Sequence, residues 1–178
     1  MKGLLDIASQ FGFVLAALFG PICYAGSIVA FFHSAWGFWR QAQPDNPYRD
    51  RPWVPVASFV FSGALATFDR LLTKANVSAG STVVVGLSDA VSYTPTAAPA
   101  SLLGATPGEF VVNLVVLFQA FFQNFGAMAC LWAFLSFQAR TTGRGNRTVG
   151  SCGAQFVFGM LLINVVTVSQ WLVDRFKT

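Results

Sequence analysis

The sequence predicts an all-α membrane protein in which four hydrophobic helices form two tandem helical hairpins joined by basic links. Apolar residues make up 54% of the 178-residue chain and charged residues only 10%, whereas soluble domains carry roughly 25% charge. The mean hydropathy of +0.59 agrees with this composition. In addition, the uncharged runs are long. As helices that rise about 1.5 Å per residue, they are long enough to cross a hydrocarbon core about 30 Å thick.

The clearest hairpin lies near the C-terminus. An uncharged run from Phe110 to Ala139 is followed by a link with three arginines and two glycines (residues 140–147) and by a second uncharged run from Thr148 to Val173. A water-exposed helix needs a polar face, which these runs lack, so they are interpreted as membrane spans. The link has the composition of a turn, and its arginines exclude it from lipid.

The first span of the N-terminal half runs from Phe11 to Trp39 without a formal charge. Pro21 inside it predicts a kink, because proline removes one helical N–H. A signal peptide is the alternative for this end of the chain, with cleavage near Ala25. The apolar run continues well past that residue, which favours a retained span.

The second span is the shortest of the four. It opens at Pro52 and ends at Phe68, before Asp69 and Arg70. Its seventeen residues correspond to roughly 25 Å of helix, at the lower limit for a span. If the charged pair lies at the membrane boundary, we expect the helix to extend through Leu72.

These runs divide the chain into a first membrane hairpin (residues 1–72), an extracytoplasmic loop rich in Ala, Ser, Thr and Pro (residues 73–108) and a second membrane hairpin (residues 109–178). Within the loop, a short strand pair or an apolar flap is expected in Ser81–Ser92. Residues Ala97–Pro107 are expected to form irregular loop.

The two halves are similar to each other in layout, since each has a long apolar span, a basic link and a second span. Trp36-Gly-Phe38 before the first link matches Trp132-Ala-Phe134 before the second. Phe59-Val-Phe61 after the first link matches Phe156-Val-Phe158 after the second. These matches suggest an internal repeat, with chance similarity between Phe-rich segments as the alternative.

Four spans place both links on one side of the membrane and both termini on the other. The links hold six basic residues, namely Arg40, Arg49, Arg51, Arg140, Arg144 and Arg147. The other side holds Lys2, Arg70, Lys74, Arg175 and Lys177. Because dense positive charge in short loops resists translocation, we expect both links in the cytoplasm, with the termini and the middle loop outside.

The third span has a predicted polar face. At 100° per residue its amides fall within one arc, opposite most of its aromatic residues, and they are Asn113, Gln119, Gln123, Asn124 and Gln138. Amides inside a bilayer need partners. Hydrogen bonding between helices is the favoured interpretation, and the wall of a polar conduit is the alternative.

Catalytic and metal-binding patterns are not found in the sequence, so we expect neither an enzyme nor a cofactor. The single histidine, His33, lies at a span end among aromatic residues, where an interfacial position is expected. The carboxylates lie at span boundaries or in loops, Asp69 among them, which disfavours an ion or proton pathway. The three cysteines lie inside apolar runs and are expected to be packing residues: Cys23, Cys130 and Cys152.

The C-terminal hairpin resembles a known family. An aromatic-rich span, a link containing Thr148-Val-Gly150 and the run Phe156-Val-Phe-Gly-Met-Leu-Leu-Ile-Asn-Val165 are similar to the IcmC/DotE/TraQ group, small inner-membrane proteins of type IVB secretion and conjugation systems. The resemblance implies a multi-pass protein of the bacterial inner membrane that works with other subunits of such an apparatus.

The layout is also similar to two conjugative-pilin hairpins in tandem. This likeness implies a homo-oligomer that polymerises into a conjugative pilus, extracellular after assembly, or into a conduit. Phospholipid would be the bound ligand, and the six link arginines would contact lipid phosphates or single-stranded DNA in transit. The alternatives are a non-polymerising inner-membrane scaffold subunit of the same apparatus and a small transporter or channel.

Overall fold

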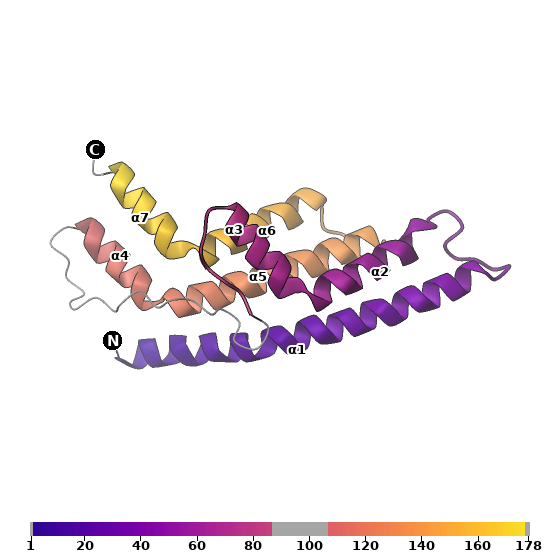
Figure 1. Cartoon of the computed structure of the whole chain (residues 1–178), viewed down its shortest axis with the longest axis horizontal. Coiled ribbons are helices and arrows are strands. Elements are labelled where there is room, and N and C mark those ends of the chain that lie inside the picture. The colour runs from indigo at the N-terminus through magenta and orange to yellow at the C-terminus, as the bar shows by residue number, and fades with distance from the viewer. Residues whose placement is uncertain (1, 87–106, 177–178) are drawn as a thin grey trace.

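The computed structural model describes residues 2–86 and 107–176 of the chain (Figure 1). Its helices are α1 (Lys2–Gln41), α2 (Trp53–Ala66), α3 (Phe68–Ser78), α4 (Pro107–Leu117), α5 (Gln119–Thr141), α6 (Val149–Ile163) and α7 (Val165–Phe176). Helix α1 packs along α2, and α5 packs along α6. The predicted all-α class and the two tandem hairpins are therefore confirmed.

Two helices are long and apolar enough to cross a membrane alone, Gln10–Gln41 within α1 and Gln119–Thr141 of α5. The pairs α2–α3 and α6–α7 pass the same test only when each pair is taken together, and they are bent by 77° and 83°. With each bent pair counted as one span, the described chain has up to four spans by length and composition. These are the helices of a multi-pass membrane protein.

Helix α1 is continuous over 40 residues and therefore about 60 Å long. It runs through Pro21 without interruption, so the loss of one N–H at the expected kink does not end the helix. Figure 1 shows α1 lying along the whole length of the bundle.

The other three predicted spans are not continuous helices. The second stops at Ala66, so Leu72 lies on the bent helix α3 and does not extend the span. The third is divided at Phe118 into α4 and α5, and the fourth is divided at Asn164 into α6 and α7. Sequence reasoning gave the correct apolar runs but missed these breaks.

The breaks at Thr67 and Asn164 are built alike. Thr67 Oγ1 donates a hydrogen bond to the Gly63 carbonyl, and Asn164 Nδ2 donates one to the Met160 carbonyl, each at 3.0 Å. The backbone N–H of each break residue also reaches that same carbonyl, at 3.2 Å. A polar side chain that bonds the carbonyl four residues earlier competes with the helical ladder and bends helices. This competition gives a physical reason for both bends.

Equivalent breaks support the internal repeat suggested by the sequence. Thr67 and Asn164 are 97 residues apart, and the same separation relates Phe59-Val-Phe61 to Phe156-Val-Phe158. Both breaks lie at the end of a short apolar helix that returns from a basic link. Each half of the chain therefore consists of a long helix, a link, a short helix and a bent continuation.

The described connection after α3 is tied back onto that helix. Thr73 Oγ1 donates to the Val85 carbonyl at 3.2 Å and accepts from the Val85 N–H at 3.0 Å. Residues 87–92 of the expected strand pair or flap in Ser81–Ser92, and the loop expected in Ala97–Pro107 apart from Pro107, lie outside the described residues.

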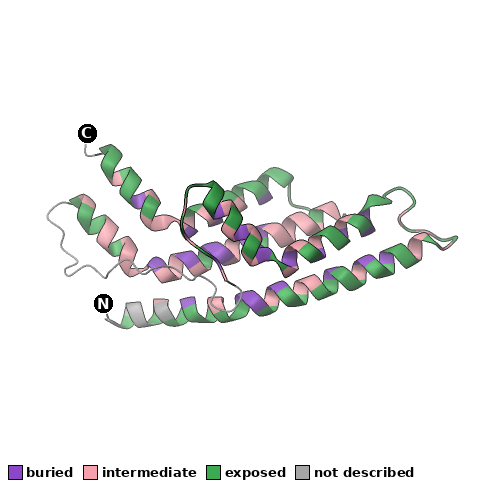
Figure 2. Ribbon diagram, viewed as in Figure 1, coloured by how far each residue is buried: buried purple, intermediate pink, exposed green. Residues whose placement is uncertain are grey.

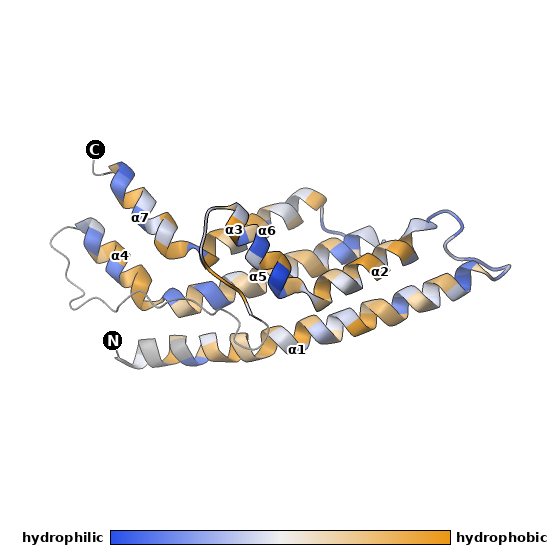
Figure 3. Ribbon diagram, in the orientation of Figure 1, coloured by the Kyte–Doolittle hydropathy of each residue, from blue (hydrophilic) through white to orange (hydrophobic). Residues whose placement is uncertain are grey.

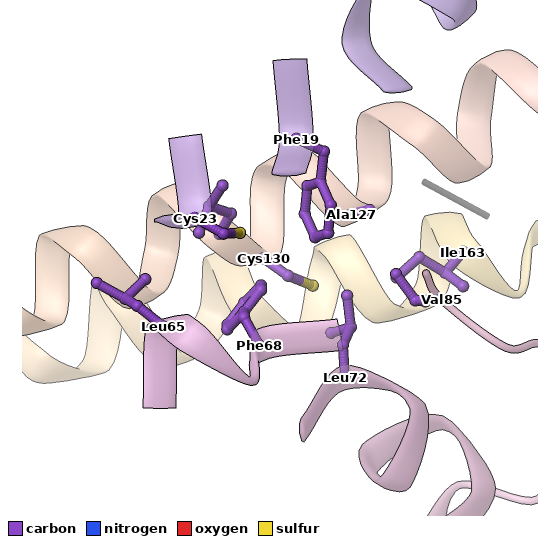
Figure 4. Packing of buried hydrophobic residues seen from close by; sticks show 10 residues of the cluster. Phe19, Cys23, Leu65, Phe68, Leu72, Val85, Ala127, Cys130 and Ile163 are labelled. Carbon is purple, nitrogen blue, oxygen red and sulfur yellow. The ribbon is translucent and has the colours of Figure 1, made fainter. Parts of the chain in front are cut away.

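The hydrophobic core lies where α3 turns back against the other helices (Figure 4). Five helices and the segment after α3 supply its buried side chains, which are Phe19, Cys23, Leu65, Phe68, Leu72, Val85, Ala127, Cys130, Leu131 and Ile163. Cys152 is also buried, and the three cysteines carry free thiols. Their expected role as packing residues agrees with this burial.

Small residues bring α5 and α6 into close contact. A Cβ atom added to Gly126 would lie 2.6 Å from the Gly159 carbonyl oxygen, and one added to Gly159 would lie 2.5 Å from Cys130 Sγ. Helix pairs in membranes depend on such close backbone approach, because lipid tails are as apolar as the side chains.

We expect the substitution Gly126→Ala to lower the free energy of unfolding by about 1–3 kcal/mol, because the added methyl group overpacks this contact. The measurement is reversible unfolding in mixed detergent micelles. Gly153→Ala is the matched control on α6, since nothing lies within 4 Å of a Cβ atom there. Equal stability losses for the two variants would contradict the contact.

Candidate functional site

Polar side chains gather in two places. One is the end of the bundle that carries both links, here called the basic end and consisting of Arg40, Arg49, Arg51, Arg140, Arg144 and Arg147. Figure 1 shows the two links toward the same end and both termini at the opposite end. The other is the amide cluster at the level of the helix breaks, formed by Asn76, Gln123 and Asn164.

The structure brings the two links into contact at the basic end. Arg51 of the first link reaches Gly143 of the second, where an added Cβ would lie 2.6 Å from Arg51 Nη1. Gly143 has a φ of +80°, a backbone conformation that residues other than glycine rarely adopt. Arg144 Nη2 lies 3.3 Å from His33 Nδ1, so the second link also contacts α1. A guanidinium only donates, which makes Nδ1 the acceptor.

Other arginines of the basic end bind neutral groups. Arg147 Nη1 donates to Gln155 Oε1 at 2.6 Å, and the Arg40 guanidinium lies over the Trp36 ring at 5.7 Å from its centroid. Arg49 and Arg140 are exposed. Across residues 2–86 and 107–176, none of the six arginines of the basic end forms an ion pair with a carboxylate.

The basic end is therefore a positively charged surface whose charge is not neutralised within the described chain. The links contain two acidic residues, Asp45 and Asp50, against six arginines. Planar guanidinium groups match phosphate oxygens in a bidentate way. An arginine beside a tryptophan at a helix end is typical of the headgroup layer of a membrane. The arrangement can bind phosphate groups at the membrane surface.

A pocket of about 220 Å³ opens between α1 and α5 next to the basic end. Its polar wall includes His33, Gln138 and Arg144, and its apolar wall includes Val29 and Leu135. The pocket thus combines cationic and hydrogen-bonding groups with an apolar groove that leads toward the bilayer interior.

The amide cluster lies inside the bundle. Gln123 Nε2 donates to the carbonyl of Ile163 at 3.2 Å, at the end of α6, where the break leaves carbonyls without helical donors. Asn164 Nδ2 donates to Asn76 Oδ1 at 3.2 Å, and Asn76 Nδ2 donates to the Val83 carbonyl at 3.4 Å. The cluster therefore joins α3, α5 and the break between α6 and α7.

The predicted polar face of the third span is divided by the break at Phe118. Gln119 and Gln123 are buried on α5, and Asn124 Nδ2 donates to the Gly12 carbonyl of α1 at 3.1 Å. Asn113 lies instead on α4, where it lines a separate pocket of about 230 Å³ with Glu109 and Asp174. The expectation that all these amides share one helix face was wrong, because the helix does not continue through Phe118.

Hydrogen bonding between helices is the role that the structure gives to Gln123 and Asn124. Their partners are the backbone carbonyls of Ile163 and Gly12. Sequence reasoning missed a further pair of amides, Asn76 and Asn164, which bond each other. Asn164 is the only amide between Gln155 and Gln170 in its apolar run, a signal that could have marked it as a break residue. Asn76 gave no such signal, because it falls in a segment interpreted as loop.

Three buried amide oxygens have no hydrogen-bond donor among the described residues: Gln123 Oε1, Asn124 Oδ1 and Asn164 Oδ1. Amide oxygens accept two hydrogen bonds each, and buried polar groups in proteins are normally satisfied. Gln123 and Asn164 of the amide cluster, and Asn124 beside it on α5, can therefore accept hydrogen bonds beyond those that hold the helices together.

No protein family model, curated protein or solved structure matches this chain. The resemblance to the IcmC/DotE/TraQ group remains a prediction from the sequence.

A double-mutant cycle of Asn76→Ala and Asn164→Ala should give a coupling energy of about 0.6 kcal/mol and at most about 1.7 kcal/mol, the average and the maximum found for hydrogen bonds between helices in a membrane protein. Unfolding of the two single variants and the double variant provides the measurement. Asn146, exposed in the second link, is the control partner and should show no coupling with Asn164. Additive effects at Asn76 and Asn164 would mean that their bond does not hold α3 in place.

Proposed function

We propose that this protein is a structural membrane subunit of a bacterial conjugation or type IVB secretion apparatus and that it self-assembles into a conjugative pilus or conduit. The observation that carries the proposal is the basic end, where two hairpins of the same build present six arginines without an ion pair among the described residues. Such a surface suits phosphate groups, whether of lipid or of DNA.

The large exposed apolar surface supports self-assembly in a membrane. Large side chains of α1 and α2 are exposed along much of both helices (Figure 2), among them Phe13 at 75%, Phe32 at 67% and Val60 at 64%. Lipid tails or the apolar faces of neighbouring copies would cover such a surface. In this proposal, each copy contributes both kinds of contact.

The topology of the hairpins fits an inner-membrane precursor. Both links would lie in the cytoplasm before assembly, since short loops with dense arginine resist translocation. After assembly the same links would face the lumen of the filament or conduit. Its partners would be membrane phospholipid, other copies of the chain, other apparatus subunits and single-stranded DNA in transit.

Sheared extracellular filaments from donor cells provide the direct test. We expect them to contain this protein as a major component, detected by mass spectrometry after filaments are separated from membranes. An unrelated inner-membrane protein of the same cells is the control for contamination. If the filaments lack the protein while donor membranes retain it, the non-polymerising scaffold becomes the better description.

Replacing Arg140, Arg144 and Arg147 together with glutamine should reduce DNA transfer by at least about tenfold, because the cationic phosphate-binding groups of the second link are lost. Mating frequency is measured at equal amounts of protein in the membrane. The matched lysine triple variant keeps the charge without the bidentate geometry and should retain part of the transfer. Normal DNA transfer by the glutamine variant would mean that these arginines serve only to set the membrane topology.

A further inference from the structure

Helix α3 lies beside the middle of the bundle, alongside the apolar span of α1. Its first residue, Phe68, packs on Phe19 of α1, with 6.0 Å between the ring centroids. Phe19 is about 14 Å along α1 from Gln10, where the apolar span begins. The sequence placed Asp69 and Arg70 at a span boundary, but the 77° bend carries them alongside the interior of the α1 span.

The two sides of α3 are chemically different. Phe68, Leu72 and Asn76 recur every four residues and are buried against the bundle. Arg70 and Lys74, also one turn apart, are exposed on the other side. Figure 3 shows α3 with strongly hydrophilic segments beside the largely hydrophobic helices around it.

At the same depth, α1 presents an apolar surface. Leu18, next to Phe19, is 46% exposed, and Phe11, Phe13 and Val14 are exposed farther toward the N-terminus. Exposed apolar residues on a membrane helix belong in lipid or against another apolar surface. The apolar surface of α1 thus extends beyond the level of α3 toward the N-terminus, which favours a position of the charged side of α3 at membrane depth.

Charged side chains within a membrane face a water-filled cavity or the interior of a bundle, because hydrocarbon does not solvate them. Non-spanning backbone at membrane depth is likewise tolerated only where protein buries it or where it lines water. Several contacts hold α3 in its place. Phe68 and Leu72 are in the core, and Asn164 binds Asn76.

We propose that the charged face of α3, formed by Arg70 and Lys74, lines a water-filled space at membrane depth that is closed by other copies of this chain. The proposal rests on the self-assembly in the proposed function and identifies which side of each copy faces water. One side of the subunit, along α1, then faces lipid or apolar neighbours, and α3 faces the aqueous space. Two cations per copy would make the wall attract anions.

Two cysteine variants at the same depth test the inference. Lys74→Cys and Leu18→Cys are introduced separately into a background in which Cys23, Cys130 and Cys152 are replaced by alanine. Both variants are also made in the wild-type background, in case the triple replacement does not fold. There, the reaction rate of the unsubstituted protein, whose three cysteines are buried, is subtracted. A charged, membrane-impermeant methanethiosulfonate is added to both sides of native membranes. Because the reactive species is the thiolate in water, we expect Lys74→Cys to react at least about tenfold faster than Leu18→Cys.

Each other pattern of reactivity overturns the inference. Equal rapid reaction would place this level outside the bilayer, and equal protection would place α3 in lipid or in a dry contact. In the same membranes, a variant with both Phe19→Cys and Phe68→Cys must form a disulfide cross-link between α1 and α3. If it does not, α2 and α3 straighten into one span and Lys74 leaves the membrane.

The oligomeric state, measured by chemical cross-linking in the same membranes, separates this inference from the proposed function. Oligomers with an unreactive Lys74→Cys would overturn the inference alone. A chain that remains monomeric in membranes of assembling donor cells would overturn both the self-assembly and the inference that depends on it.

Discussion

Hydrogen bonding at two helix breaks is the constraint on which the rest of this structure depends. A bilayer offers no water to a free carbonyl or N–H group, so a helix can break there only where side chains or other helices supply partners. Thr67 and Asn164 begin each break by bonding the carbonyl four residues earlier. Gln123 then donates to Ile163, and Asn164 donates to Asn76. These bonds hold α3 against the bundle and set where α7 begins, and so they decide which surfaces remain exposed.

The two polar regions of the protein follow from this arrangement and have different roles. At the break level, neutral amides meet inside the bundle and serve mainly to join helices. At the links, the six arginines form no ion pair with a carboxylate among the described residues, and their contacts include Trp36, Gln155, Gly143 and His33. Positive charge is thus concentrated at one end of the bundle, while the hydrogen bonds that join α3, α5 and the break between α6 and α7 lie near its middle.

The sequence was sufficient to predict the apolar runs, the two hairpins and the position of the arginines, because the absence of charge over a long run is a strong local signal. The breaks were not predictable in the same way. Thr67 and Asn164 are single polar residues that an uninterrupted helix would also tolerate, and whether they bend it depends on partners distant in the chain, such as Asn76. The division of Asn113 from Gln119 at Phe118 had no polar signal at all. The amide bonds of Gln123 and Asn124 could be anticipated as a class of contact but not as particular pairs.

The equivalence of the two breaks has a consequence for the symmetry of any assembly. Both hairpins run in the same direction, so the chain carries a parallel internal pseudo-repeat. A ring or filament of this protein would contain twice as many hairpins as polypeptides. Images at low resolution would then index on the hairpin spacing and report half the true repeat. The correct lattice would emerge only where α3, folded against its bundle, differs from α7, which packs on α4.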